Sequence, residues 1–380
     1  MRARTRASWL WALALSWATL AGAEIREGAR IVPQKIRDGL YVLHGGMGQG
    51  ASVGVRVGED GILLVDAMRA ESNERLSKAI RKISEKPVRF VLNTHSDADH
   101  SGGNEFFARA GATILAQENF RYSSAFHQVR FRDKLSLPFD GEEVEAQAVL
   151  SHAPDDALIF LRGSNVLFMG DAFTTNWHPT FYTGGVSGQF QAIDLALSLA
   201  DEGTVVVPGH GPVTDRQGLL TYRKNTGDWL ERVGELHRLG RSVDEMFRDE
   251  ALQEIKDRFN GEGREEFIPE ARLKRFIQRT VSSELVAAYP LPEEALGRYP
   301  GRYFPEEGPA LEVLLRDGKL FAAREGSFFV QLVPLSATRF HLRGWIDAHI
   351  LFQLDRAGSP VTLTASIGDS IYEARRTDLP

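Results

Sequence analysis

The sequence predicts an α/β domain followed by a smaller antiparallel β domain. Up to about residue 285, short apolar runs alternate with helical patterns, as in a sheet covered by helices. Several of these runs end in His or Asp, which indicates a site at the strand ends. Beyond residue 290, short strand-like runs separated by Gly turns predict an antiparallel sheet or small barrel. The predicted segments are therefore 1–23, 24–290 and 291–380.

The bulk composition restricts the possible chemistry. The chain has 380 residues, of which 43% are hydrophobic and 25% charged, as in ordinary globular proteins. It has no cysteine, which excludes a thiolate nucleophile, a cysteine zinc site and a disulfide framework. Any transition-metal site must therefore use His and carboxylates, a donor set that suits zinc, iron or manganese.

The N-terminus has the pattern of a secretory signal peptide. Three arginines between residues 2 and 6 precede the apolar run 9–20, and the small residues 21–23 form an Ala-Gly-Ala cleavage signal. Cleavage would leave 42 Lys and Arg against 51 Asp and Glu, a net charge of −9. We therefore expect a periplasmic or secreted protein without a stable membrane anchor or a nucleic-acid partner. An uncleaved N-terminal anchor is the alternative.

Strand patterns lead up to the first polar cluster. The predicted elements are strands over 39–44, 52–57, 61–66 and 88–92, with a helix over 72–84. Asp66 ends the third of these strands. Two roles remain open for it: a hydrogen bond to a metal-binding histidine from behind, or capping of the segment that follows.

The cluster itself follows the strand over 88–92. Residues 94–103 bring two imidazoles and two carboxylates together within six positions, at His95, Asp97, Asp99 and His100. Buried carboxylates and imidazoles are costly unless they are paired or bind a metal. The spacing therefore predicts a metal cluster on the loop before a helix near Asn104. A polar surface turn is the alternative.

Later strand ends supply possible partners. After a strand at 113–116, the predicted strands are 148–152, 157–161, 166–171 and 205–211. The first of these carries His152, the third Asp171 and the last His210. One histidine at a strand end is usually structural, but three ends with His or Asp after a His/Asp-rich loop form a constellation.

The segment 117–147 is polar and mixed, and its pattern predicts no clear element. Its aromatic residues either line a pocket mouth or pack in the core, and its histidine has no ligand-like spacing. These residues are Phe120, Tyr122, Phe126, Phe131 and His127.

Helices follow the last histidine. The predicted helices are 228–239, one opened by the capping box Ser242-x-x-Glu245, and 271–288. A break at 289–292 ends this part. The predicted strands of the second domain are 311–315, 320–322, 328–333, 340–342, 349–354 and 361–365.

The order of these motifs resembles the metallo-β-lactamase superfamily. Its signature Thr-His-x-His-x-Asp-His-x-Gly-Gly matches here at Thr94, His95, Asp99, His100 and Gly102-Gly103. Further matches are Gly170-Asp171, Gly209-His210-Gly211 and the isolated histidine His152, although Ala153 stands where Thr is usual. The resemblance covers roughly residues 35–285.

This resemblance implies an αββα sandwich with metals at one sheet edge. It implies site one from His95, Asp97 and His152, site two from Asp99, His100 and His210, and Asp171 as a bridge. The C-terminal segments 297–303 and 317–320 are similar to a small β domain of some secreted serine β-lactamase-like hydrolases.

Asp97 departs from the family pattern, which has His at this position. Asp reaches less far than His, so direct contact with a metal would require the loop to move. If it binds, the site is less positive and suits harder ions. The flavodiiron oxygen reductases of the superfamily use a carboxylate here, which keeps a di-iron redox protein open as an alternative. No flavin-binding extension is evident in this chain.

The predicted function is that of an exported metallo-hydrolase acting on a small molecule. One or two Zn²⁺ ions, with iron or manganese as alternatives, would provide hydroxide at neutral pH for attack on an ester, lactone, thioester or β-lactam. Asp99 or Asp97 would accept a proton. Asn176, Trp177 and His178 line the pocket or, for Trp177, pack in the core. A catalytically weak metal-binding accessory protein is the second alternative.

Overall fold

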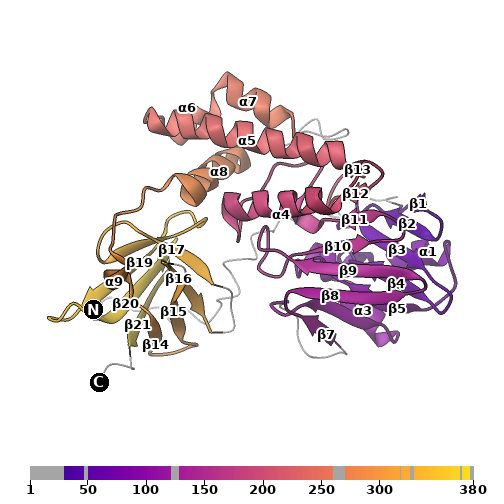
Figure 1. Ribbon diagram of the computed structural model, residues 1–380, viewed down its shortest axis with the longest axis horizontal. Helices are drawn as coiled ribbons and strands as arrows, with labels where there is room; N and C mark the ends of the chain where they lie inside the picture. The colour runs from indigo at the N-terminus through magenta and orange to yellow at the C-terminus, as the bar shows by residue number, and fades with distance from the viewer. Residues whose placement is uncertain are drawn as a thin grey trace, which may run out of the picture.

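The computed structural model describes residues 30–46, 50–120, 128–259, 270–316, 318–325, 329–368 and 370–376. The predicted signal peptide lies outside these residues, as do Tyr122, Phe126 and His127. Within them, no helix combines the length and the apolar character needed to cross a membrane. The described chain forms a two-sheet sandwich, a layer of helices and a barrel (Figure 1).

The first sheet has seven strands in chain order. They are β1 (Pro33–Arg37), β2 (Leu40–Leu43), β3 (Val53–Val57), β4 (Ile62–Val65), β5 (Val88–Leu92), β6 (Thr113–Gln117) and β7 (Gln128–Phe131). From β4 onward neighbouring strands are parallel, so their carboxyl ends share one edge. The apolar run of β4 is buried along its whole length, as expected for a strand covered on both faces.

The second sheet packs face to face against the first. Its order is β13 (Thr214–Asp215), β12 (Val205–Val207), β11 (Val166–Phe168), β10 (Ala157–Leu161), β9 (Glu142–Ala148) and β8 (Lys134–Phe139). Leu63 and Val65 of the first sheet share a core with Ile159 and Phe168 of the second. Gly54 permits the close approach, because a Cβ there would lie 2.5 Å from the Phe168 ring.

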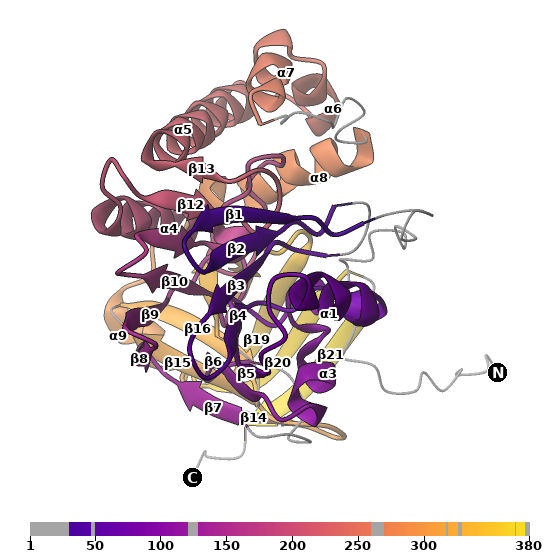
Figure 2. The same cartoon turned by 90° about the vertical axis from the view of Figure 1, so that its right-hand side faces the viewer.

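Helices cover both outer faces. The helices α1 (Asn73–Arg81), α2 (Ala98–Ser101) and α3 (Asn104–Arg109) follow strands of the first sheet, and α1 and α3 cover its outer face (Figure 2). On the other side lie α4 (Gly185–Leu199), α5 (Arg216–Arg238), α6 (Val243–Phe247), α7 (Glu250–Asp257) and α8 (Glu270–Thr280). Trp229 of α5 stacks on Phe276 of α8 at 4.2 Å between ring centroids. The predicted αββα sandwich is thereby confirmed.

The C-terminal part is a closed antiparallel barrel, within the alternatives that the sequence left open. Its strands are β14 (Gly301–Pro305), β15 (Leu311–Arg316), β16 (Lys319–Arg324), β17 (Val330–Pro334), β18 (Arg339–Leu342), β19 (Ala348–Leu354), β20 (Pro360–Ile367) and β21 (Ser370–Arg376), with the short helix α9 (Glu293–Leu296) before them. Tyr303, Phe340 and Phe352 are buried in its interior.

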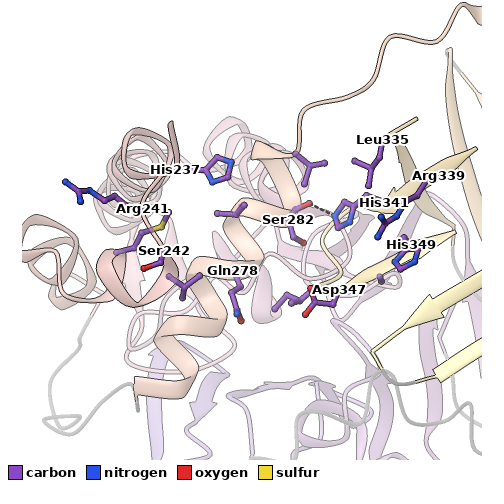
Figure 3. Close-up of a pocket in the computed structure, with 16 residues that line it drawn as sticks. His237, Arg241, Ser242, Gln278, Ser282, Leu335, Arg339, His341, Asp347 and His349 are labelled. Atoms are coloured by element: carbon purple, nitrogen blue, oxygen red, sulfur yellow. Dashed lines mark hydrogen bonds between the residues drawn. The ribbon is translucent and has the colours of Figure 1, made fainter. Parts of the chain in front are cut away.

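The barrel joins the helical layer through a turn of π-helix, Val281–Leu285, that continues α8. His341 Nε2 donates to the Ser282 carbonyl at 2.9 Å, and Arg343 donates to the Ser283 carbonyl at 2.9 Å. A cavity of about 460 Å³ lies at this junction, with Arg241 and Ser242 on one side and Arg339 and His349 on the other (Figure 3).

Several predicted elements differ from the structure. The strand expected to end at His152 ends at Ala148, so His152 lies on a loop. The segment 117–147, left without a predicted element, contains β7, β8 and most of β9. The helix predicted over 271–288 ends earlier, and α5 begins twelve residues before its predicted start of 228. Phe120 and Phe131 are buried, the latter in the core between the sheets.

Candidate metal centre

Asp66 leaves β4 at the same edge where the 94–103 loop leaves β5. Its backbone φ is 63°, an uncommon conformation for a non-glycine residue. The carboxylate accepts hydrogen bonds from Thr94 N at 2.8 Å, Thr94 Oγ1 at 2.7 Å and His100 Nδ1 at 2.8 Å. The helical turn that follows begins after Arg69, so Asp66 is not its cap. The bond to Nδ1 leaves Nε2 of His100 to face the cluster.

The short helix α2 sets the positions of the next two polar side chains. Asp97 is its N-cap residue, and Ser101 Oγ donates to the carbonyls of Ser96 and Asp97 at 3.0 Å each. Asp99 and His100 therefore lie on a helical turn, where the sequence predicted a loop. Both strand ends and this turn direct their side chains to one edge of the sandwich.

One half of the cluster is formed by His95, Asp97 and His152. Each of the three residues offers one donor atom, and these atoms lie within 4.8 Å of one another. Asp97 Oδ2 lies 3.1 Å from His152 Nε2 and 3.7 Å from His95 Nε2. Thr180 Oγ1 lies 2.9 Å from Nδ1 of His152 and orients that ring. The Asp97 side chain is 39% exposed, so this half opens to solvent. Asp97 Oδ2 therefore lies close to both histidine donor atoms in this conformation of the loop.

Asp99, His100 and His210 form the other half, with the same close grouping of donor atoms. His210 Nε2 lies 3.4 Å from Asp99 Oδ2 and 3.4 Å from Asp171 Oδ1. Asp171 Oδ1 is also 3.2 Å from His100 Nε2, while its Oδ2 is 3.8 Å from His152 Nε2. Asp171 thus lies between the two halves.

A glycine makes room for this central carboxylate. A Cβ on Gly209 would lie 2.1 Å from Asp171 Oδ1 and 2.7 Å from the carbonyl carbon of Gly170. The Gly-Asp and Gly-His-Gly motifs therefore have a steric basis: the backbone before His210 passes directly beside Asp171.

Opposite charges outweigh burial in setting the ionisation of the cluster. Burial lowers the pKa of His95, but the Asp97 carboxylate beside it raises that pKa to about 9. Burial raises the pKa of Asp171, but His210 and His100 hold it well below its usual range. Without metal, His95 and His100 are thus imidazolium ions paired with carboxylates, and a divalent cation must displace their protons.

Three buried atoms in this cluster have no hydrogen-bond partner among the described residues: His95 Nε2, His100 Nε2 and Asp171 Oδ1. Buried polar atoms are rarely left unpaired. The donor set of imidazole nitrogens and carboxylate oxygens is the one that zinc, iron and manganese accept. The residues present therefore fit a metal pair, and all seven residues named from the sequence as ligands lie in this cluster.

Two supporting residues were not predicted. Thr94 Oγ1 contacts Asp66, His95 and His100, and its place before the His-rich motif was the available signal. Thr180 contacts His152 across 28 positions of sequence, and no local pattern marks it. Such contacts depend on how separate loops meet.

The segment after Asp171 has a mixed role. His178 stacks on Phe276 at 4.1 Å and its Nδ1 donates to the Pro179 carbonyl at 2.6 Å, so it belongs to the helical layer. Burial lowers its pKa to about 4. Further along, the Tyr182 ring lies 5.0 Å from the His152 ring. This segment therefore encloses the solvent-open half of the cluster.

Comparisons with known proteins agree with this geometry. Residues 45–210 match the model of the metallo-beta-lactamase superfamily. A probable hydroxyacylglutathione hydrolase of Schizosaccharomyces pombe is 26% identical over 145 residues, 37% of this chain and 56% of that protein. The chain thus spans little more than half of this relative.

Two solved structures are also similar. The inverting sec-alkylsulfatase of a Pseudomonas species has a TM-score of 0.52 and 18% identity, covering 70% of this chain and 53% of its own. A metallo-beta-lactamase from Pontibacter korlensis has a TM-score of 0.47 and 21% identity, covering 52% of this chain and 100% of its own. At these identities the likeness to the alkylsulfatase shows the fold alone.

Proposed function

We propose that the chain is a metal-dependent hydrolase of an ester-type bond in a small molecule, because residues 45–210 match the model of the metallo-beta-lactamase superfamily. The observation that carries the proposal is the group of buried atoms His95 Nε2, His100 Nε2 and Asp171 Oδ1, which make no hydrogen bond among the described residues. They face one another where two strand ends meet. The ligands would be His95, Asp97 and His152 in site one and Asp99, His100 and His210 in site two, with Asp171 between them.

Two bound ions, most simply Zn²⁺, would supply an acidified water with a pKa of about 7 and an electrophile for the scissile carbonyl. Residues of the chain would orient the ligands and accept the proton. Asp66 keeps His100 in the tautomer whose Nε2 faces the cluster. Asp97, 39% exposed, is the carboxylate most open to a substrate and would hold the proton released during attack. Asp99 is 14% exposed and lies 3.6 Å from the Arg69 guanidinium, which favours a fixed, ionised ligand.

Thioesters are the first substrate class to test, because the curated relative is named as a probable hydroxyacylglutathione hydrolase. Esters, lactones and β-lactams follow. Export to the periplasm or medium is part of the proposal and depends on the N-terminal pattern of residues 1–23. Determining the N-terminus of protein recovered from the periplasm would test it, and a chain that starts at Met1 in the cytoplasm would contradict it.

The decisive experiment pairs elemental analysis with this substrate panel. Protein purified without added metal should contain one to two ions per chain, and His100→Ala should lose metal and lower the hydrolytic rate by about 10³-fold or more. A panel on which the wild-type, metal-loaded protein is inactive would contradict the proposal. Stoichiometric iron with a charge-transfer band would instead favour the di-iron alternative, which the carboxylate at Asp97 supports.

A further inference from the structure

Arg279, near the C-terminal end of α8, lies close to the site-one half of the cluster, and no carboxylate among the described residues pairs with it. Its guanidinium stacks on the Tyr182 ring, 4.1 Å from the centroid, and the His152 ring lies 5.0 Å from the same tyrosine ring. Within the described residues it forms no ion pair. A cationic side chain therefore lies one aromatic ring away from a predicted metal ligand.

Two other arginines, Arg69 and Arg343, each lie close to a carboxylate. Arg69 lies 3.6 Å from Asp99, and Arg343 lies 3.4 Å from Glu284. Each has a carboxylate that offsets the cost of burying its charge. Arg279 is partly exposed, and burial lowers its pKa to about 10, so it is still charged at neutral pH. Among the described residues, the face of the Tyr182 ring is the group that offsets its desolvation.

We propose that Arg279 binds an oxyanion of the substrate, a carboxylate, sulfate or phosphate, while the scissile group occupies the metal cluster. The planar guanidinium presents a fork of N–H donors that matches two oxygens of such a group. Tyr182 contacts both the guanidinium and the His152 ring. The substrate would carry its oxyanion at the end of a short chain beyond the bond that is cleaved. This inference rests on the proposed function.

The surroundings hold Arg279 and Tyr182 in place. A Cβ on Gly344, in the loop between β18 and β19, would lie 3.0 Å from the Tyr182 carbonyl. The same loop carries Arg343, which donates to the Ser283 carbonyl just after α8. The barrel therefore supports the segment that carries the proposed anion site. A preorganised site loses less entropy on binding than a flexible surface arginine does.

The kinetic test uses two nitrophenyl esters that differ only in a free carboxylate or its methyl ester at the far end of the acyl chain. Arg279→Gln should lower kcat/KM for the anionic ester roughly ten- to hundredfold, mainly through KM, and leave the neutral ester unchanged. Lys274→Gln is the matched control, since Lys274 lies on the same helix but is paired with Asp244 and Glu270. Equal losses for both esters would show a structural role and overturn the proposal.

A binding test separates this inference from the proposed function, because it needs no turnover. Calorimetry on metal-loaded protein would use benzoate, phenyl sulfate and phenyl phosphate, with methyl benzoate as the neutral control. At least one of the anions should bind the wild type about tenfold or more tightly than Arg279→Gln, and Arg279→Lys should retain part of that affinity. Metal content and melting temperature establish that each variant is folded. Equal affinities of wild type and Arg279→Gln for all three anions would overturn the inference even in an active hydrolase.

Discussion

The two halves of the cluster are supported by different parts of the chain. In site two, His100 is held by the carboxylate of Asp66, which comes from the sandwich itself. In site one, His152 is held by the hydroxyl of Thr180 and lies against the ring of Tyr182. The segment that carries these two residues packs on α8 and on the barrel.

This difference in support indicates which half of the cluster departs from the superfamily pattern. A carboxylate behind a ligand histidine fixes its tautomer and increases its basicity, whereas a hydroxyl only orients the ring. We therefore expect site two to bind its ion more tightly and site one to be the adjustable half. Site one also contains Asp97, where the family pattern changes and which is the most exposed side chain of the cluster.

The largest expected effect is on the pH dependence of stability, and it arises from His178 in the segment that supports site one. The folded chain keeps His178 neutral down to a pKa of about 4, whereas the unfolded chain protonates it near 6.5. The unfolded state therefore binds more protons in this window, and stability falls as pH drops from 6.5 to 4, by about 3 kcal/mol in total. Urea denaturation of the metal-free protein at pH 7 and pH 5 measures this change.

His178→Phe retains a ring to stack on Phe276 but removes the titrating group. Between pH 7 and pH 5 the wild type should lose about 2 kcal/mol more stability than this variant. If both lose the same amount, His178 does not make the support of site one sensitive to acid.

The second prediction compares Asp66, which holds His100 in site two, with Thr180, which holds His152 in site one. Asp66→Asn keeps the size of the side chain but has one acceptor oxygen instead of two, so it cannot accept from Thr94 N and His100 Nδ1 together. It should weaken ion binding in site two about 10- to 100-fold. Thr180→Val should weaken ion binding in site one only. The loss of affinity should be smaller than for Asp66→Asn, because the contact that it removes is with a neutral hydroxyl. Competition with a chromophoric chelator measures both affinities. Losses of equal size in the two variants would remove the distinction between the halves.

The parts of this fold that could be predicted are those with local signals. Buried strands such as β4 and β10 are continuous apolar runs, and the Ser242–Glu245 capping box forms as expected. The strand β9 was not predicted because glutamates alternate on its exposed face and mask the apolar positions. The helix α4 was not predicted because glycines at 185 and 188 lower its helix propensity.

The contacts of the cluster also divide into those that a local sequence signal predicts and those that have no local signal. His95, Asp97, Asp99 and His100 lie within one motif, and the sequence spacing alone groups them. The contacts of His152 with Thr180, and of Tyr182 with Arg279, join loops and a helix separated by many residues. These contacts form only when the separate segments pack together in the folded chain, so no local pattern in the sequence could reveal them.

The smallest effect is expected at Asp97 itself. Its carboxylate already lies 3.1 Å from His152 Nε2 and 3.7 Å from His95 Nε2, so Asp97→His exchanges one donor for another without rebuilding the loop. An imidazole is a better donor for zinc than a carboxylate, and it makes the site more positive by one charge. We therefore expect zinc in site one to bind about tenfold more tightly and site two to be unchanged, measured by the same chelator competition. Unchanged stoichiometry and affinity would show that residue 97 is not a ligand, and that the adjustable half of the cluster is set by Thr180 and Tyr182 alone.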